Sequence, residues 1–226
     1  MDFYMAIEKR HSVRSYQPYQ LKATEKKNIK GISKALECIH QDNLLNWELE
    51  ETQQPSGRLF AEHDIPPEDY LLEYGFQGEQ IILSLIEIGF DTLWKAAGIP
   101  SHIPAYLIFG KGKERKTFSE KVMGWFVNGG DRKDMSHFLQ ADTSTLTDSQ
   151  LKIIHSCIRS PSAINKQPWT FQFHDKKTLD IQIKGKSKYN YLDMGICLYH
   201  AYRAFSIEYD TPELTKKGDF HWIVKA

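Results

Sequence analysis

The sequence predicts an α+β fold in which two similar α/β halves are joined in one chain. The first observation is an internal repeat: a shift of about 119 residues places Cys38 on Cys157, Asn46 on Asn165 and Ile88 on Ile207. The second is that both halves show the same order of patterns: helix, strand, buried helix and strand. We therefore expect halves over 1–118 and 119–226 that pack together as one compact pseudo-symmetric domain.

Helical and alternating apolar spacings define the elements of the first half. Apolar residues at helical spacing predict two helices, and the run from Gly78 to Gly89 is apolar nearly all round, which is typical of a buried helix. The predicted elements are a helix over 3–10, a helix over 24–40 with Thr24 as its N-cap, a strand over 45–49, an exposed loop over 51–69, the buried helix over 78–89 and a strand over 105–109.

The second half follows the same scheme. Thr147 or Asp148 caps a predicted helix, which Pro161 ends because its ring clashes with the preceding turn and it lacks an N–H. The remaining elements are a connector over 119–142 whose form the pattern leaves open, a strand that begins near Phe171, a strand over 179–183, an aromatic-rich helix over 193–207 and a strand over 221–224.

The composition excludes several classes of function. The 226 residues carry 29 basic and 29 acidic side chains, so no basic field favours nucleic acid or an anionic membrane. The three scattered cysteines favour a reducing compartment over a disulfide framework or a zinc site. The histidines form no metal-binding motif. With no signal-type core and no membrane-length apolar run, we expect a cytoplasmic globular protein.

The chain is organised around the loop from Arg159 to Phe171, with the sequence RSPSAINKQPWTF. Ser162 and Asn165 present short polar side chains from a helix-to-strand connection that Pro168 keeps extended. Such a loop suits recognition of the polar edge of a flat heterocycle. An ordinary helix–strand connection would have the same turn chemistry.

A second polar cluster, Arg10-His11-Ser12-Val13-Arg14, follows the first predicted helix. Arginine offers a bidentate fork and serine a hydroxyl, so the cluster suits a phosphate group. A charged helix end on a solvated surface would look the same.

Taken together, the two segments resemble the nitroreductase-like FMN oxidoreductases. Pro-Ser-Ala-x-Asn-x-Gln-Pro-Trp is similar to their flavin-binding loop, and Arg-His-Ser-x-Arg to their FMN phosphate motif. The resemblance implies a nitroreductase-like FMN fold. It also implies that the phosphate is held by Arg10, His11, Ser12 and Arg14, and the polar ring edge or ribityl chain by Pro161, Ser162, Asn165 and Gln167. No catalytic side chain is implied, because the flavin carries the chemistry.

Two further segments resemble the family more weakly. The family often has Gly-x-Gly-Thr-x-Trp beside flavin N5, which places Thr92, Leu93 and Trp94 there. Asp91 departs from that pattern, and an acid there would disfavour a reduced anionic flavin. Trp94 would serve equally as a core or rim aromatic. Lys113 and Arg115 lie in a basic stretch where the family often completes cofactor contacts, although a solvated charge run would look alike.

The resemblance is to the branch in which both halves of a nitroreductase dimer are fused. The phosphate motif occurs only in the first half, since its shifted position holds residues 129–133 with the sequence GGDRK, and the Pro-Ser-Ala loop occurs only in the second. We therefore expect one FMN per chain, between the halves, and a vacant second site. The chain would be a monomeric pseudo-dimer, and further dimerisation is left open.

The implied activity passes electrons from NADH or NADPH through FMN to a small-molecule acceptor, such as a quinone, a nitroaromatic or a similar conjugated compound. The alternatives are a non-catalytic flavin-binding protein, serving as a sensor or carrier, and a structural relative that binds nothing. Resemblance fixes neither the acceptor nor the nicotinamide.

Overall fold

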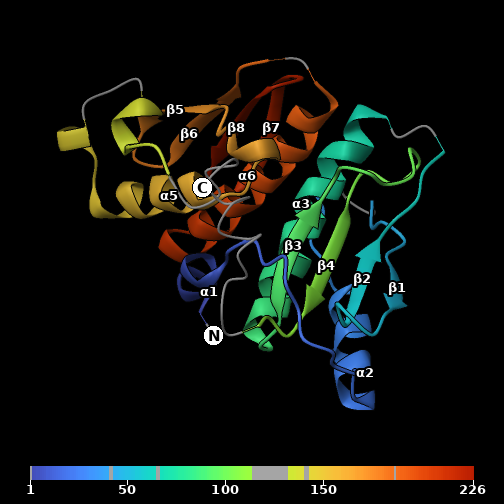
Figure 1. Ribbon diagram of the computed structural model, residues 1–226. Helices are drawn as coiled ribbons and strands as arrows, with labels where there is room; N and C mark the ends of the chain where they lie inside the picture. The colour runs from blue at the N-terminus through green and yellow to red at the C-terminus, as the bar shows by residue number, and fades with distance from the viewer. Residues whose placement is uncertain (1, 41–42, 65–66, 114–131, 140–142, 186) are drawn as a thin grey trace.

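Two long helices form the centre of the molecule. The computed structural model describes residues 2–40, 43–64, 67–113, 132–139, 143–185 and 187–226. Helices α3 (Glu68–Glu87) and α6 (Lys188–Glu208) lie side by side, with one sheet against α3 and another against α6 (Figure 1). No helix within these ranges has both the length and the apolar character needed to cross a bilayer.

The shorter elements repeat around this pair. Those of the first half are α1 (Phe3–Lys9), α2 (Ala23–Ile32), β1 (Glu48–Glu51), β2 (Gly57–Phe60), β3 (Asp91–Lys95) and β4 (Tyr106–Gly110). Those of the second half are η1 (Met135–His137), η2 (Thr143–Thr145), α5 (Asp148–Arg159), η3 (Ala163–Asn165), β5 (Trp169–Asp175), β6 (Thr178–Ile183), β7 (Glu213–Gly218) and β8 (His221–Lys225).

The described strands form two antiparallel sheets with the same strand order. The first is β1-β2-β4-β3 and the second β5-β6-β8-β7, so the strands of one sheet correspond to those of the other one by one. This confirms the predicted α+β fold of two pseudo-symmetric halves. The boundary between residues 118 and 119 lies outside the described residues and stays a prediction.

The central helices touch backbone to backbone at a pair of glycines. A Cβ atom on Gly75 would lie 2.3 Å from the carbonyl oxygen of Leu192, and one on Gly195 would lie 2.0 Å from that of Leu72. Both pairs are related by a shift of 120 residues, so the contact is reciprocal, as at a two-fold dimer interface. Only glycine permits this approach.

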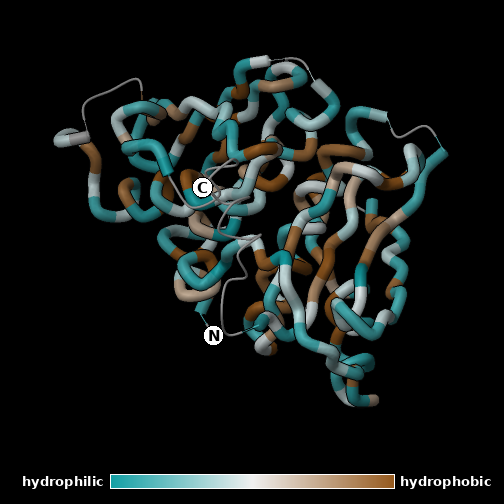
Figure 2. The backbone as a smooth tube through the Cα atoms, in the orientation of Figure 1, coloured by the Kyte–Doolittle hydropathy of each residue, from teal (hydrophilic) through white to brown (hydrophobic). Residues whose placement is uncertain are grey.

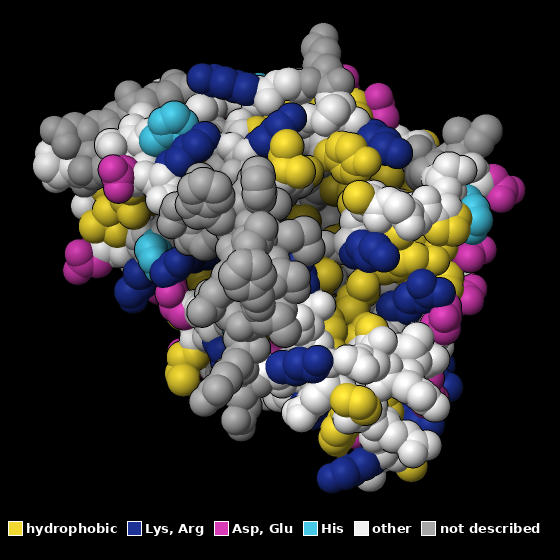
Figure 3. Space-filling view, viewed as in Figure 1, with side chains coloured by type: hydrophobic (Ala, Val, Ile, Leu, Met, Phe, Trp, Pro, Cys, Tyr) yellow, Lys and Arg dark blue, Asp and Glu magenta, His cyan; other side chains and the backbone are white. Residues whose placement is uncertain are grey.

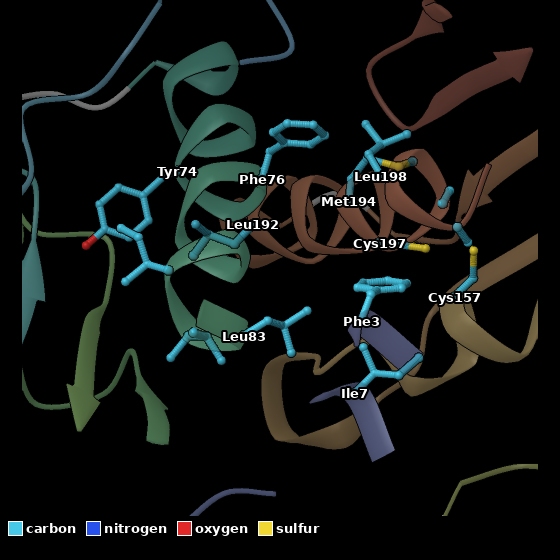
Figure 4. Packing of buried hydrophobic residues seen from close by; sticks show 14 of the residues in the cluster. Phe3, Ile7, Tyr74, Phe76, Leu83, Cys157, Leu192, Met194, Cys197 and Leu198 are labelled. Carbon is cyan, nitrogen blue, oxygen red and sulfur yellow. The ribbon is translucent and has the colours of Figure 1, made fainter. Parts of the chain in front are cut away.

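The core surrounds the same helix pair. Figure 4 shows Phe76 pointing from α3 toward α6, Phe3 reaching from α1, and Cys157 of α5 facing Cys197 of α6. Burying a large apolar side chain contributes about 1.5–3 kcal/mol. Hydrophobic residues follow the inner surfaces of the central helices and strands, whereas α2 is mostly hydrophilic (Figure 2). The halves are therefore joined through a shared core.

The predicted helix over 24–40 is too long, because α2 ends at Ile32. The apolar spacing continues, but the following backbone is bound by side chains of α3. The N–H of Glu37 donates to Oε1 of Gln80 (2.9 Å) and the N–H of His40 to Oε1 of Glu73 (2.7 Å). These contacts hold residues 35–40 in a non-helical path that no local pattern reveals.

The other differences concern short or polar segments. Helix α3 begins ten residues before the predicted Gly78, because buried acids and amides occupy its first half. The predicted loop over 51–69 contains β2, the segment after α3 forms β3, and β7 was not expected. The strand predicted at 45–49 lies at Glu48–Glu51.

The remaining elements agree with expectation. Helix α1, strand β4 and the second-half elements α5, β5, β6 and β8 lie close to their predicted positions, whereas α6 begins five residues before the predicted Asp193. Thr147 is the N-cap of α5, where its hydroxyl accepts from the N–H of Gln150. Much of the connector predicted at 119–142 lies outside the described residues.

Candidate functional site

The phosphate-type motif leaves the end of α1 and pairs with β3. Arg10 is the C-cap of α1, and its N–H donates to the carbonyl of Ala6 (2.9 Å). Ser12 then pairs in parallel with Thr92, while the N–H of Val13 donates to the Thr92 carbonyl (3.0 Å). Two predicted site segments, remote in sequence, thus lie side by side.

The remaining first-half residues surround this pairing. Lys113 is exposed, and its N–H donates to the Ser15 carbonyl (3.1 Å), beside Arg14 of the motif. His11 is exposed, and Arg115 lies outside the described residues. The carboxylate of Asp91 accepts from the N–H of Gly112 (2.8 Å), so this acid ties the end of β4 to the start of β3.

The Pro-Ser-Ala loop has a strained backbone. Ile164, Asn165 and Gln167 have φ of 47°, 55° and 50°, a left-handed region that non-glycine residues rarely adopt. Asparagine tolerates it, but β-branched Ile164 does not, and its side chain is 73% exposed. Such strain persists only where neighbours enforce it, and it is often associated with functional sites.

Several contacts hold the loop in this shape. The N–H of Gln167 donates to the hydroxyl of Ser162, and the N–H of Ala163 to the carboxyl of Asp193, both at 2.9 Å. Gln167 is buried; its amide oxygen accepts from the N–H of Lys133 (3.1 Å) and its amide nitrogen contacts the Asn165 carbonyl (3.3 Å). In this structure Gln167 therefore braces the loop.

Arg132 was missed by sequence reasoning. In the sequence it is only one residue of the segment 129–133, which stands where a second phosphate motif would be. Its guanidinium donates through Nη1 to Oδ1 of Asn165 (3.1 Å) and through Nη2 to the carbonyl of Arg159 (2.9 Å). Since no motif contains it, only the folded structure reveals its place beside the loop.

The two motifs converge through Arg159. Its guanidinium forms a bidentate ion pair with Glu8 of α1, with Nε 2.9 Å from Oε1. This pair holds the end of α5 against the end of α1, next to Arg10. Burial, together with the charges of Arg10 and Arg159, lowers the pKa of Arg132 to about 10. The first-half motif and the second-half loop therefore belong to one electrostatic cluster.

Within this cluster of arginines, Arg10 has a hydrogen-bond donor without an acceptor. Its Nε atom is buried and has no hydrogen-bond partner, although the residue as a whole is only partly buried. Burial lowers the pKa of Arg10, the charge of Glu79 opposes this, and Arg159 adds to it. A buried N–H donor without an acceptor is costly, so the Nε of Arg10 favours an anion at this position.

Glu79 does not fill that need, because it is already engaged. Its Oε2 accepts from the indole N–H of Trp94 (2.8 Å), and its Oε1 lies 3.0 Å from Nε2 of fully buried His200. Nδ1 of His200 lies 2.9 Å from the carbonyl of Ser156, which can only accept, so Nδ1 carries a hydrogen. Two acceptors 3.0 Å apart would repel, so one further proton lies between Glu79 and His200. The pair is neutral overall.

The residues therefore fit a phosphate ester such as that of FMN. Arg10 is a partly buried cation with an unpartnered Nε, and the carboxylates of Glu8 and Glu79 are engaged by Arg159 and by His200 with Trp94. A phosphate dianion would supply acceptors for planar donor forks. Ser12, whose backbone pairs with that of Thr92, follows Arg10 by two residues in the same motif.

Trp94 lies over the central helix. A Cβ atom on Gly78 would come 2.4 Å from its ring, so the glycine of α3 makes room for the indole. This packing and the hydrogen bond to Glu79 hold the partly buried Trp94 between β3 and α3.

Cavity volume does not locate the site. Among the described residues, a cavity of about 290 Å³ lies between α5 and β5, lined by residues such as Gln150 and Phe173 and by no residue of 10–14 or 161–169. A small one of about 10 Å³ touches His11 and Thr92. On the face in Figure 3, Lys and Arg side chains intersperse hydrophobic ones over the first sheet. Convergent donors, rather than an open cavity, define the candidate site.

Asp193 makes the loop sensitive to pH. Burial raises its pKa to about 7, against the smaller opposing effects of the Ala163 N–H and Lys166. Between about pH 4 and 7 the native carboxyl holds a proton that the unfolded chain has lost, so the free energy of unfolding falls as pH rises through this window.

We expect Asp193→Asn to abolish this dependence, since an amide still accepts from Ala163 but does not ionise. In urea unfolding at about pH 5 and about pH 8, the variant should gain on the order of 1–4 kcal/mol relative to the wild type at the higher pH. An unchanged difference between the two proteins at both pH values would contradict this assignment.

The chain is similar to known nitroreductases over nearly its whole length. The family model described as "Putative TM nitroreductase" matches residues 2–205. The solved structure of a putative nitroreductase from Thermotoga maritima has a TM-score of 0.82 and 29% identity, covering 100% of this chain and 94% of that one.

Two other solved structures match half of the chain. A nitroreductase family protein from Clostridium novyi NT has a TM-score of 0.40 and 16% identity, over 50% of this chain and 87% of its own. An FMN-dependent nitroreductase from Clostridium difficile R20291 has a TM-score of 0.40 and 13% identity, over 50% and 88%. Likeness at this level carries no argument. No curated protein sequence gives a significant match.

Proposed function

The chain belongs to the nitroreductase family described as "Putative TM nitroreductase", and on that premise we propose that it is an FMN-dependent oxidoreductase with one FMN between its halves. FMN, when bound, supplies a site that accepts hydride from NADH or NADPH and passes electrons to a conjugated acceptor such as a quinone or nitroaromatic. The observation that carries the proposal is the buried, unpartnered Nε of Arg10 beside the strained loop of the other half.

The contacts of the chain's own residues support the following roles. Arg10, with Ser12 and Arg14 of the same motif, would bind the phosphate. The Ser162–Gln167 loop, held by Asp193, would orient the ring through Asn165. Thr92 to Trp94, fixed by pairing with Ser12 and by Glu79, would line one side of the ring. These residues bind and orient, and none is assigned a proton transfer.

A single site per chain is supported by an asymmetry in the core. Shifted by 120 residues, Glu79 corresponds to Tyr199 and Gln80 to His200. The side chain of Gln80 donates to the carbonyl of Glu37 (2.8 Å), as His200 does to the carbonyl of Ser156. Gln80, however, is not a histidine, and the residue that corresponds to Glu79 is Tyr199, so no acid–histidine pair forms at that position. Within the described part of the chain, the Glu79–His200 pair therefore has no counterpart at the positions related by the repeat, which hold Tyr199 and Gln80.

The proposal is tested with FMN-loaded protein under anaerobic conditions. We expect NADH or NADPH to abolish the absorbance of oxidised flavin, and a quinone to restore it. FMN that stays oxidised with both nicotinamides, yet is reduced by dithionite, would contradict oxidoreductase function. That outcome would favour the sensor or carrier role.

A further inference from the structure

Glu79 and His200 form a fully buried acid–histidine pair to which each half of the chain contributes one member. Oε1 of Glu79, on α3, lies 3.0 Å from Nε2 of His200, on α6. The other carboxylate oxygen accepts from the indole of Trp94 (2.8 Å), and the other ring nitrogen donates to the carbonyl of Ser156 (2.9 Å). The pair is therefore satisfied on both sides, and the proton that its members share leaves it without net charge.

The pair lies beside α1, the helix that ends at the phosphate-type motif. The ring of Phe3 in α1 packs against the imidazole of His200, with ring centroids 6.0 Å apart. Burial lowers the pKa of Arg10 and of Arg132, and Glu79 is the acid whose charge opposes this effect at both residues. Among the described residues, however, Glu79 forms its ion pair with His200 and not with an arginine. An uncompensated charge on Glu79 would therefore act on Arg10.

Such a charge would compete with an anionic ligand. The free carboxylate would be a counterion for Arg10, whose buried Nε lacks an acceptor, and it would repel a phosphate at the same place. The imidazole of His200 prevents this, because it shares a proton with the acid. The corresponding residue of the first half, Gln80, binds a carbonyl oxygen in the same way but has an amide, which does not titrate.

We propose that His200 is a positioning residue for a phosphate ligand and acts through Glu79. It keeps the acid compensated and turned toward Trp94, and this leaves Arg10 available to the anion. A residue of the second half thereby sets the affinity of the first-half motif for phosphate. The inference rests on the proposed function, in which the anion is the phosphate of FMN. His200 would then favour FMN over riboflavin, which lacks the phosphate.

His200→Gln tests this role. The glutamine amide still donates to the Ser156 carbonyl, as Gln80 does to its own partner, but it shares no proton with Glu79. We expect the affinity for FMN to fall at least about tenfold and that for riboflavin to stay within about threefold, because only FMN meets the released charge with a phosphate. Unchanged FMN affinity would overturn the proposal. Equal losses for both flavins would also overturn it, since a distorted site would then be the cause.

The same substitution in a Glu79→Gln background tests whether the effect passes through the acid. Glu79→Gln removes the charge, and its amide can accept from Trp94 and donate to His200. In this background His200→Gln should change the affinity for FMN by less than about threefold, because no carboxylate is left to be released. A loss of the same size in both backgrounds would overturn the proposal.

A measurement without flavin separates this proposal from the proposed function. In the flavin-free His200→Gln protein, the released carboxylate has Arg10 as its counterion, so the loss of Arg10 becomes more costly. The change in melting temperature caused by Arg10→Met should be less favourable there than in the wild type by at least about 2–4 °C. If the wild type binds neither flavin, the proposed function fails, while this comparison still decides whether His200 keeps Glu79 from Arg10. Equal shifts in both backgrounds would overturn the proposal.

Discussion

Arg10→Met is expected to weaken FMN binding by about two orders of magnitude, because at least two charge-assisted hydrogen bonds to the phosphate are lost. It should also stabilise the flavin-free protein by about 1–3 kcal/mol, since a partly buried cation whose Nε has no acceptor is replaced by an apolar side chain. The opposite signs distinguish a ligand-binding residue from a structural one. Riboflavin, which lacks the phosphate, should bind both proteins alike.

Fluorescence titration and urea unfolding would measure these effects. Arg58→Met is the matched control, because Arg58 lies on β2 in an ion pair with Glu50 (2.7 Å), away from both motifs. It should leave the affinity for FMN unchanged. An Arg10 variant that binds FMN like the wild type would contradict the phosphate assignment, as would equal losses for FMN and riboflavin.

Gly195→Ala is expected to destabilise the protein by more than about 4 kcal/mol, among the largest effects of single substitutions. Its Cβ would lie 2.0 Å from the Leu72 carbonyl oxygen and 2.8 Å from the Phe76 nitrogen, so α3 and α6 would have to move apart. Because these helices join the halves, the whole domain should be affected.

Thermal unfolding of the Gly195→Ala protein measures this loss of stability, and Gly31→Ala serves as the control substitution. Gly31 lies within α2 and a Cβ there meets nothing within 4 Å, so alanine should stabilise the helix by up to about 1 kcal/mol. A Gly195→Ala protein that melts with the wild type would show that the helix pair is not the rigid junction described above.

The sequence predicted the elements whose signals are local. Helix α5 is one, because Thr147 caps it and Pro161 follows its end. The repeat predicted two similar halves, and both sheets have the same strand order. Strand β7 could not be predicted, because charged residues fill this edge strand and only pairing with β8 identifies it.

The candidate site could be predicted from the sequence only where motifs indicate it. The segments around Arg10 and Asn165 matched family motifs, and the structure places both near Arg159. Glu79 looks like a surface residue of a helix, and its burial against His200 depends on a contact across 121 residues. Arg132 likewise meets Asn165 only through tertiary packing. Buried polar groups of this kind leave no periodic signal.

The flavin content of the purified, untagged protein tests the central claim most directly. After denaturation, the released chromophore is identified and its amount is compared with that of the chain. We expect close to one FMN per chain, taken up to the same limit when FMN is added. Two per chain would contradict the single asymmetric site, and a colourless protein that takes up no added FMN would contradict flavin binding altogether.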